Sequence, residues 1–371
     1  MPVYDDPTDA RALDAAALQQ WTAAIVEEIG TPPDIAADVA EVLVSSDRRG
    51  IASHGTARLP LYASLVEGGD MDPVARPTIQ RQRPALVLMD AHNGWGHHAC
   101  RVGVDLAIER ARELGSCTVV LRGSNHYGIA GWYALRAAQQ GLIGVSMTNS
   151  SPLVAPTRSR VPMLGTNPIA IAAPAGRFDA FCLDMATSTV PRGRIEVAAR
   201  RGWSLPVGWA IDVEGNPATT PEAALEGSLH PLGGTEATGG YKGYGLALVV
   251  ELLTGILGGA AFGPNIVSLF SVHAGPSDLG ETFMVIDPSA IDEPGAFEAR
   301  LEELIEQLIA APTVPDAPGP VLIPGAPEAA AERLAAQRGV VIDREHHESL
   351  LDMGLRMGIP LPPYRVPAAR S

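Results

Sequence analysis

The chain has 371 residues, so we expect two or three subdomains that share one folded unit rather than a single small core. Its composition of 46% hydrophobic and 19% charged residues indicates a globular protein and excludes a disordered chain. The net charge of −15 argues against nucleic acid or an anionic membrane surface as a partner, because either would repel an acidic protein.

Cysteine usage and the start of the chain bear on the cellular compartment. Cys100, Cys117 and Cys182 show no paired spacing and leave an odd thiol, so we expect neither a disulfide framework nor a metal site. The first residues lack the basic and apolar regions of a secretory signal, and no apolar run reaches membrane-spanning length. We therefore predict a cytoplasmic protein without a membrane partner.

The spacing of apolar residues predicts the secondary structure in chain order. From about 8 to 69 the period is helical, with a helix start at Asp34 after two prolines, which predicts an N-terminal helical unit over 1–75. The elements predicted after it are a strand at 85–91, a helix at 98–114, a strand at 117–122, a helix at 130–141, strands at 142–149, 167–174 and 178–186, a helix at 188–201, a surface excursion at 202–221, a helix at 243–258, a strand at 282–287 and helices at 296–311, 327–338 and 343–357.

These elements predict an α/β fold. Strands outnumber what strict strand–helix alternation would place, so we expect a mixed sheet flanked by helices across 76–310. Closely spaced prolines over 311–327 predict an extended linker. The C-terminal segment, 311–371, would then return the chain to the N-terminal helices.

The first candidate site lies in DRRGIASHG (47–55) and the residues that follow it. If a helix begins near Ser53, then His54, Arg58 and Tyr62 are four residues apart and share one helix face. Such a face would offer a 2-oxo acid a guanidinium fork for its carboxylate and an acid of near-neutral pKa for its carbonyl oxygen. The alternative is structural, in which Ser53 caps a helix and His54 packs or faces water.

A second candidate site is GSNHYGIAG (123–131), which joins a predicted strand to a predicted helix. Small residues at such a turn let backbone N–H groups at the helix start approach a phosphate. The segment does not match the G-x-G-x-x-G dinucleotide pattern. A tight strand–helix turn without a ligand explains it equally well.

Two further segments carry single charged residues of interest. In FCLDMATS (181–188), Asp184 ends an apolar strand and needs a partner, either the start of the following helix or a histidine whose tautomer it fixes. In GGYKGYG (239–245), Lys242 is the only lysine of the chain, and its point charge suits a phosphate or a ribose. Glu251 is open to a catalytic role, but we expect it to be a buried ion-pair partner of an arginine.

Taken together, these segments resemble the malate/L-lactate dehydrogenase family, which is unrelated to the Rossmann-fold lactate and malate dehydrogenases. The family includes enzymes that act on sulfolactate, ureidoglycolate, diketogulonate and the cyclic imines piperideine- and pyrroline-2-carboxylate. The resemblance runs from about 10 to 358 and rests on RRGIASHGTARLPLY, GSNHYGIAGWYALRAAQQGLIGVSMTNSSPLVAP, LGTNPIAIAAP, LDMATS, LPVGWAID and GGYKGYGLALVVELL, in that order. One departure is PRGR at 191–194, where many relatives have ARGK.

The resemblance implies a largely antiparallel mixed sheet with a non-Rossmann nicotinamide-binding fold over 76–310, a helical domain from both termini, a homodimer, and NAD(P)H as cofactor. It implies that Ser53, His54 and Asp184 form a proton-donating relay. It also implies a second set of residues that bind the substrate, namely Arg58, Tyr62, His126 and Thr166. The residues implied to line the cofactor are His126, Tyr127, Gly128, Ile129, Ala130, Asp184, Met185, Ala186 and Lys242.

The leading hypothesis for function is hydride transfer between NAD(P)H and a small 2-oxo or 2-hydroxy acid, with the proton exchanged by His54 or by His126. The first alternative is reduction of a cyclic imino acid, in which His54 or Asp184 protonates nitrogen. A Ser-His-Asp hydrolase is disfavoured, because no G-x-S-x-G elbow surrounds Ser53. A binding protein without catalytic activity is disfavoured by the intact sequence blocks.

Overall fold

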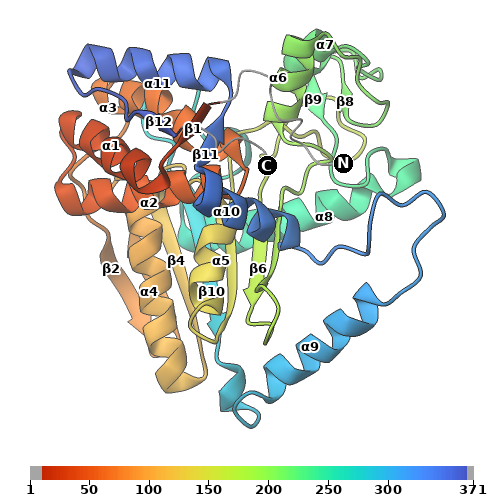
Figure 1. Cartoon of the computed structure of the whole chain (residues 1–371). Coiled ribbons are helices and arrows are strands. Elements are labelled where there is room, and N and C mark those ends of the chain that lie inside the picture. The colour runs from red at the N-terminus through yellow and green to blue at the C-terminus, as the bar shows by residue number, and fades with distance from the viewer. Residues whose placement is uncertain (1–10, 366–371) are drawn as a thin grey trace.

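A seven-stranded β-sheet lies at the centre of the structure, a computed structural model that describes residues 11–365 (Figure 1). Its strand order is β2-β3-β4-β10-β5-β6-β7. The strands are β2 (Thr78–Arg83), β3 (Leu86–Asp90), β4 (Ser116–Ser124), β5 (Ile143–Thr148), β6 (Ile169–Ala173), β7 (Phe181–Met185) and β10 (Leu279–Ile286). Within the sheet β3 and β4 are parallel, and every other neighbouring pair is antiparallel. The prediction of a mixed, largely antiparallel sheet is confirmed.

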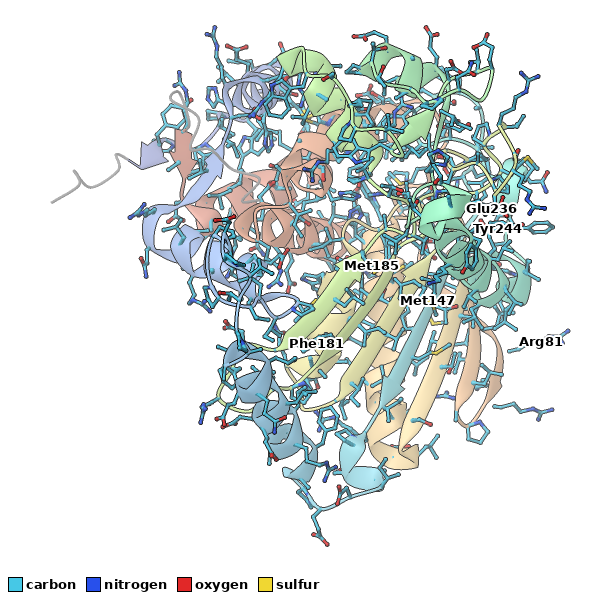
Figure 2. The ribbon with its side chains drawn as sticks, turned by 90° about the vertical axis from the view of Figure 1, so that its right-hand side faces the viewer. Arg81, Met147, Phe181, Met185, Glu236 and Tyr244 are labelled. Carbon is cyan, nitrogen blue, oxygen red and sulfur yellow. The ribbon has the colours of Figure 1, made fainter. Side chains whose placement is uncertain are left out.

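Helices pack on both faces of this sheet. On one face α4 (Gly96–Leu114) and α5 (Ala130–Ala138) cover the inward side chains of the central strands, such as Leu121 and Phe283, which are fully buried. The other face receives α8 (Gly240–Glu251), which continues through a π-helical turn, Leu252–Ile256, against β10. Figure 2 turns this side toward the viewer, with Tyr244 of α8 near the end of the sheet where Met185 ends β7.

A helical layer built from both ends of the chain lies beside the sheet (Figure 1). Its helices are α1 (Ala15–Glu28), α2 (Pro33–Arg48), α3 (Leu59–Glu67), α10 (Ala326–Arg338) and α11 (Arg344–Met357). A small sheet ties the two ends together, because β1 (Arg11–Leu13) pairs with both β11 (Val340–Ile342) and β12 (Tyr364–Arg365). The predicted helical domain from both termini is confirmed, whereas these short strands were not predicted.

Local chemistry explains where the remaining elements differ from the predictions. The helix predicted at 188–201 begins at Arg192 as α6 (Arg192–Arg201), because Pro191 stands just before it in an extended conformation. The excursion at 202–221 holds only the two-residue strand β8 (Ala210–Ile211), which pairs with β9 (Ser228–Leu229) beyond α7 (Pro221–Glu226). The helix at 296–311 is α9 (Ala296–Ile309), which projects from the body in Figure 1.

The expectation of one helix starting near Ser53 is wrong. Two 3₁₀ turns, Ala52–His54 and Thr56–Arg58, precede α3, and Gly55 between them is extended with φ −93° and ψ −152°. His54, Arg58 and Tyr62 therefore do not lie along the face of a single helix. Cys100, Cys117 and Cys182 are free and buried. Across residues 11–365, no helix combines the length and the apolar character required to cross a membrane.

Close contact between β10 and the π-helical turn yields a stability prediction. A Cβ added at Gly280 would lie 2.7 Å from the backbone nitrogen of Gly255, so Gly280→Ala should lower the free energy of unfolding by about 1–3 kcal/mol. Gly319→Ala is the matched control, because its added Cβ meets no atom within 4 Å; it should leave stability unchanged or raise it by up to about 1 kcal/mol. Urea unfolding compares the two, and equal stabilities would contradict the packing argument.

Candidate active site

A tight turn between α2 and α3 presents Ser53 and His54. The Asp47 carboxylate accepts hydrogen bonds from the Thr56 backbone N–H at 2.9 Å and from the Thr56 hydroxyl at 2.6 Å. A Cβ added at Gly55 would lie 1.8 Å from an Asp47 carboxylate oxygen, so a larger residue would displace the carboxylate that holds Thr56. The turn places the Ser53 hydroxyl 2.9 Å from His54 Nδ1. This hydrogen-bonded turn, rather than an α-helix, fixes the position of the Ser53–His54 pair.

The loop between β4 and α5 brings His126 to the same place. The rings of His54 and His126 are stacked, with centroids 5.5 Å apart. His126 Nδ1 lies 2.7 Å from the Tyr62 hydroxyl and accepts the Gly128 backbone N–H at 3.3 Å. Since the Gly128 N–H needs an acceptor, Nδ1 carries no proton, and the Tyr62 hydroxyl also donates to it. The neutral His126 ring therefore carries its proton on Nε2.

Burial and positive charge keep both imidazoles neutral. Burial, together with the nearby Arg58 guanidinium, lowers the pKa of His54 to about 4. Burial also lowers the pKa of His126 well below its usual value, with further contributions from His54, Arg58 and His97. Arg58 has no carboxylate partner among residues 11–365, and its Nε donates to the Ser53 carbonyl at 2.7 Å. The free guanidinium is thus available to an anion beside two neutral histidines.

A second guanidinium flanks the same region. The Phe270 ring lies 5.5 Å from the Arg58 guanidinium carbon and 5.9 Å from that of Arg192, at the start of α6. Arg192 also pairs with Glu196 at 3.1 Å. Sequence reasoning noted the PRGR block only as a departure from relatives and gave no signal for Phe270. The structure adds both residues to the site.

Asp184 lies near the end of β7, in contact with the start of α5. Its carboxylate accepts the Gly131 backbone N–H at 2.7 Å. Its expected role as a cap of the following helix is wrong: α6 begins at Arg192, after Pro191, without a side-chain cap, and Asp184 instead contacts the earlier helix α5. Burial raises the pKa of Asp184 to about 6, against the lowering effect of the Gly131 N–H. Among the described residues, no hydrogen bond joins Asp184 to Ser53 or His54.

Thr166 and Lys242 connect to the end of β7 through backbone contacts. The Thr166 carbonyl accepts the Thr187 N–H at 2.8 Å, and the Thr187 carbonyl accepts the Leu232 N–H at 2.8 Å. The first turn of α8 packs on Leu232, since a Cβ at Gly243 would lie 2.3 Å from the Leu232 carbonyl oxygen. Lys242 stands exposed in that turn, with its ammonium 5.9 Å from the centroid of the Tyr241 ring.

Glu251 does not pair with an arginine within the described part of the chain, so that expectation is wrong. Its carboxylate accepts the Asn149 side-chain N–H at 3.2 Å, the Asn167 side-chain N–H at 3.0 Å and the Gly263 backbone N–H at 3.3 Å. These bonds fix the segments that follow β5 and precede β6. Through Asn167, Glu251 therefore helps to hold the loop before β6 that carries Thr166.

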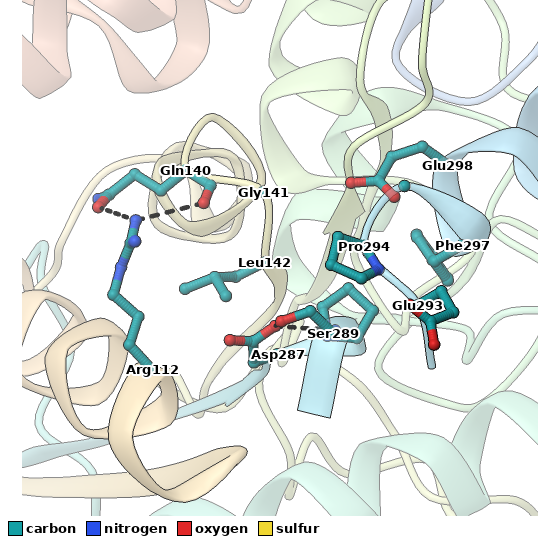
Figure 3. Close-up of a pocket in the computed structure, with 12 residues that line it drawn as sticks. Arg112, Gln140, Gly141, Leu142, Asp287, Ser289, Glu293, Pro294, Phe297 and Glu298 are labelled. Carbon is teal, nitrogen blue, oxygen red and sulfur yellow. Dashed lines mark hydrogen bonds between the residues drawn. The ribbon is translucent and has the colours of Figure 1, made fainter. Parts of the chain in front are cut away.

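A surface pocket of about 190 Å³ lies near the end of β10, around Asp287 and Leu142 (Figure 3). Arg112 on one side of it points to Gln140, and Glu293 and Glu298 stand on the other side. None of the candidate site residues lines this pocket. The histidines and Arg58 mark the better candidate for chemistry.

Comparison with known proteins gives a consistent picture. A family model described as malate/L-lactate dehydrogenase matches residues 13–351. A malate dehydrogenase of Pyrococcus abyssi is 43% identical over 76% of this chain and 78% of its own length. An L-sulfolactate dehydrogenase of Methanothermobacter thermautotrophicus is 36% identical over 91% of this chain and 94% of its own.

Solved structures agree with this similarity. The malate dehydrogenase of Pyrococcus horikoshii OT3 superposes with a TM-score of 0.87 at 35% identity, covering 95% of this chain and 97% of its own. A delta1-piperideine-2-carboxylate reductase of Pseudomonas syringae pvar. tomato superposes with a TM-score of 0.83 at 32% identity, covering 92% of this chain and 99% of its own.

The charge of Arg58 yields a prediction that requires no assay of activity. Arg58→Gln should raise the pKa of both His54 and His126, because the guanidinium disfavours the imidazolium form. A base whose pKa is lowered on folding stabilises the protein above its unfolded pKa, here 6.5, and this stability is lost as the pH falls toward 4. Arg58→Gln should therefore weaken the acid destabilisation.

The measurement is an NMR titration of the imidazole signals, assigned with His54→Gln and His126→Gln. Arg81→Gln, on the exposed strand β2, is the control and should leave both pKa values unchanged. Unchanged histidine titrations in Arg58→Gln would refute the electrostatic coupling.

Proposed function

Because the chain belongs to the malate/L-lactate dehydrogenase family and is an NAD(P)-dependent dehydrogenase of hydroxy acids, we propose that His54 exchanges the proton while Arg58 holds the substrate carboxylate. The single observation that carries this assignment is the pair of hydrogen bonds accepted by His126 Nδ1. They fix the proton of His126 on Nε2, where the neutral ring can donate but cannot accept.

His54 has the freedom that His126 lacks. Its Nδ1 contacts only a serine hydroxyl, which can donate or accept, so either tautomer of His54 is compatible with the Ser53 contact. In the oxidative direction the neutral His54, with its proton on Nδ1 directed at the Ser53 oxygen, accepts the hydroxyl proton of the substrate at Nε2 and becomes an imidazolium, whose Nδ1–H Ser53 continues to accept. His126 donates from Nε2 to the same oxygen and polarises it. In the reductive direction an anionic substrate offsets the charge of Arg58, which favours protonation of His54.

The remaining site residues receive roles from their positions. Arg58 offers a fork to the carboxylate of the substrate, and Tyr62 acts through His126 by holding its tautomer. Thr166 contributes from the loop that precedes β6, where its hydroxyl lies 3.4 Å from that of Ser150. Asp184 sets the position of the first turn of α5 through Gly131.

We place the cofactor along the segment 126–130, the end of β7 at 184–186, and Lys242. The chain fits a nicotinamide dinucleotide here for two reasons. The start of α5 has no side-chain cap at Ile129, and although Asp184 accepts the Gly131 N–H, the other first-turn N–H groups are left for a polar group of the cofactor; Lys242 carries an exposed positive charge in an acidic protein. When bound, the nicotinamide ring supplies or accepts the hydride.

The substrate class we propose is a small acid with a second anionic group, of the malate or sulfolactate kind. Arg58 and Arg192 both lie within 6 Å of the Phe270 ring, so two cations are available where a monoanion needs one. The names of the malate and sulfolactate dehydrogenases that resemble this chain support the same class.

Reduction of a cyclic imino acid is the second candidate function. It is supported by the structural similarity to the piperideine-2-carboxylate reductase. In that reaction His54 would give its proton to nitrogen, with Arg58 again on the carboxylate. The hydrolase alternative has less support, because Asp184 is bonded to Gly131 and has no hydrogen bond to His54 among the described residues.

We also propose that the chain forms a homodimer in the cytoplasm. Several large apolar side chains of α8 and the residues after it are exposed, which is typical of a surface covered by a partner. They are Leu246, Leu248, Val249, Leu252, Ile256, Leu257 and Phe262. The three free, buried thiols are compatible with a reducing compartment.

The roles of the two histidines are separated by substitution. His54→Ala should lower turnover by about 10²- to 10⁴-fold while cofactor binding is kept. His126→Asn should cause a smaller loss, since an amide still donates a hydrogen bond. The measurement is the loss of reduced-nicotinamide absorbance with pyruvate, oxaloacetate or piperideine-2-carboxylate. His92→Ala, on an exposed turn, is the control. Retained turnover in His54→Ala would transfer the proton role to His126.

Arg192 tests the substrate class. Arg192→Gln should lower kcat/KM for oxaloacetate by about 10- to 100-fold, as expected for the loss of a charged hydrogen bond, and leave kcat/KM for pyruvate nearly unchanged. Arg200→Gln, on the exposed side of the same helix, is the matched control. An equal loss for both substrates would show that Arg192 does not recognise a second anionic group.

A further inference from the structure

A glutamate lies in the middle of the sheet, beneath the loop that carries His126. Glu281 is on the central strand β10 and is 0% exposed. It pairs with Leu121 on β4 and with Thr148 on β5, just after a bulge at Gly280 that interrupts the register with β4. Because side chains alternate along a strand, Glu281 faces the same side as Phe283, toward α4 and α5.

Nothing in its surroundings compensates a negative charge. Neither carboxylate oxygen of Glu281 has a hydrogen-bond partner with good geometry among the described residues. Its nearest polar neighbours are the Ser124 hydroxyl and the Cys100 thiol. The titratable side chains that interact with it from the surrounding elements are Cys100 on α4, Tyr127 before α5, Tyr133 on α5 and Asp278 before β10. All of these are acids, and no cation is among them.

A fully buried carboxylate without a cation or donors is very costly, so the group takes up a proton instead. Burial raises the pKa of Glu281 to about 8, and Asp278 adds to the rise, while contacts with Ser124 and Cys100 oppose it. At neutral pH the side chain is therefore a carboxylic acid with one O–H to donate. The Glu281 O–H can donate to the oxygen of the neighbouring Ser124 hydroxyl.

Ser124 connects this acid to the catalytic loop. It ends β4 two residues before His126, and the loop between them is held on its other sides. The Asn125 side chain donates to the Gly94 carbonyl at 3.0 Å, and the Tyr133 hydroxyl donates to the Tyr127 carbonyl at 2.7 Å. At the β4 end of this loop two contacts have partners that can change charge: the Gly123 backbone N–H donates to Asp278 at 3.0 Å, and Ser124 interacts with Glu281.

We propose that Glu281 is a positioning residue that supports the His126 loop through Ser124 as a neutral acid, and that loss of its proton displaces the loop and inactivates the enzyme. The effect on activity rests on the proposed role of His126. A newly formed charge at Glu281 repels Asp278 and draws water or a cation into the core. The loop above it is the element that has to move to admit either.

The first experiment measures stability and requires no activity. An acid whose pKa is raised on folding stabilises the protein below its unfolded pKa, here 4.5, and this stability is lost as the pH rises to about 8. The Tm of the wild type, relative to that of Glu281→Gln, should therefore fall steadily between pH 5 and 8 and then level off. Glu109→Gln, on the exposed side of α4, is the matched control and should follow the wild type. Parallel Tm profiles for the wild type and Glu281→Gln would overturn the neutral acid.

The second experiment measures turnover against pH with oxaloacetate and the preferred reduced cofactor. Wild-type kcat should fall about tenfold within one pH unit above the transition, as expected for a single titrating group, while Glu281→Gln should lose little. Ser124→Ala removes the hydroxyl through which Glu281 supports the loop, so its alkaline fall should be reduced, as in Glu281→Gln. An alkaline fall that is identical in all three proteins would overturn the positioning role.

The two experiments separate the two proposals. If the chain reduces no 2-oxo or imino acid at any pH, the proposed function fails, and the Tm profiles still decide the state of Glu281. If Glu281→Gln does not fold, infrared spectra of the wild type at pH 7, where Asp184 is mostly ionised, and at pH 9.5 decide the same point. They should show a protonated carboxylic acid band that disappears at the higher pH, and its absence at pH 7 would refute the proposal.

Discussion

The hydrogen bond from the Tyr62 hydroxyl to His126 Nδ1 joins the two halves of the molecule. Tyr62 belongs to the helical layer and His126 to the loop above the sheet, so the bond holds two separately built layers in a fixed relation. Together with the Gly128 N–H, which needs Nδ1 as an acceptor, it leaves the proton of His126 on Nε2. Tyr62 is buried against Trp95 and His97, which leaves its hydroxyl little freedom to choose another partner. The chemistry of the site therefore depends on how the layers pack.

Arg58 gives this acidic chain a positive charge beside the two histidines, where an anion can be attracted. Arg58 lacks a carboxylate partner among the described residues, whereas most arginines of the molecule have one. Burial, and to a smaller extent this same cation, keep the neighbouring imidazoles neutral. In the function proposed above, affinity for a carboxylate and control of the proton would both involve Arg58. Glu281, buried below, keeps the core free of a competing charge as long as it is protonated.

Much of the fold could be predicted from the sequence, because long apolar runs at 117–122 and 142–149 and helical periods at 98–114 carry their own signal. The three-residue strands β1 and β11 could not, since a period needs more residues than they have. The site residues Ser53, His54 and His126 were found from their residue types and neighbours. Their geometry was not, because it depends on the bend at Gly55, which is imposed by Asp47. Phe270 lies in a loop without any regular pattern, so only the structure could reveal it.

A segment far along the chain completes the turn that holds His54. The His346 ring in α11 contacts the Thr56 hydroxyl at 2.9 Å across 290 positions, and the Trp21 indole donates to the Ile359 carbonyl across 338 positions. A chain cut before α11 would lack both contacts and would leave hydrophobic faces of the N-terminal helices uncovered. The geometry around His54 is therefore set in part by a helix that has no motif of its own and carries none of the candidate site residues.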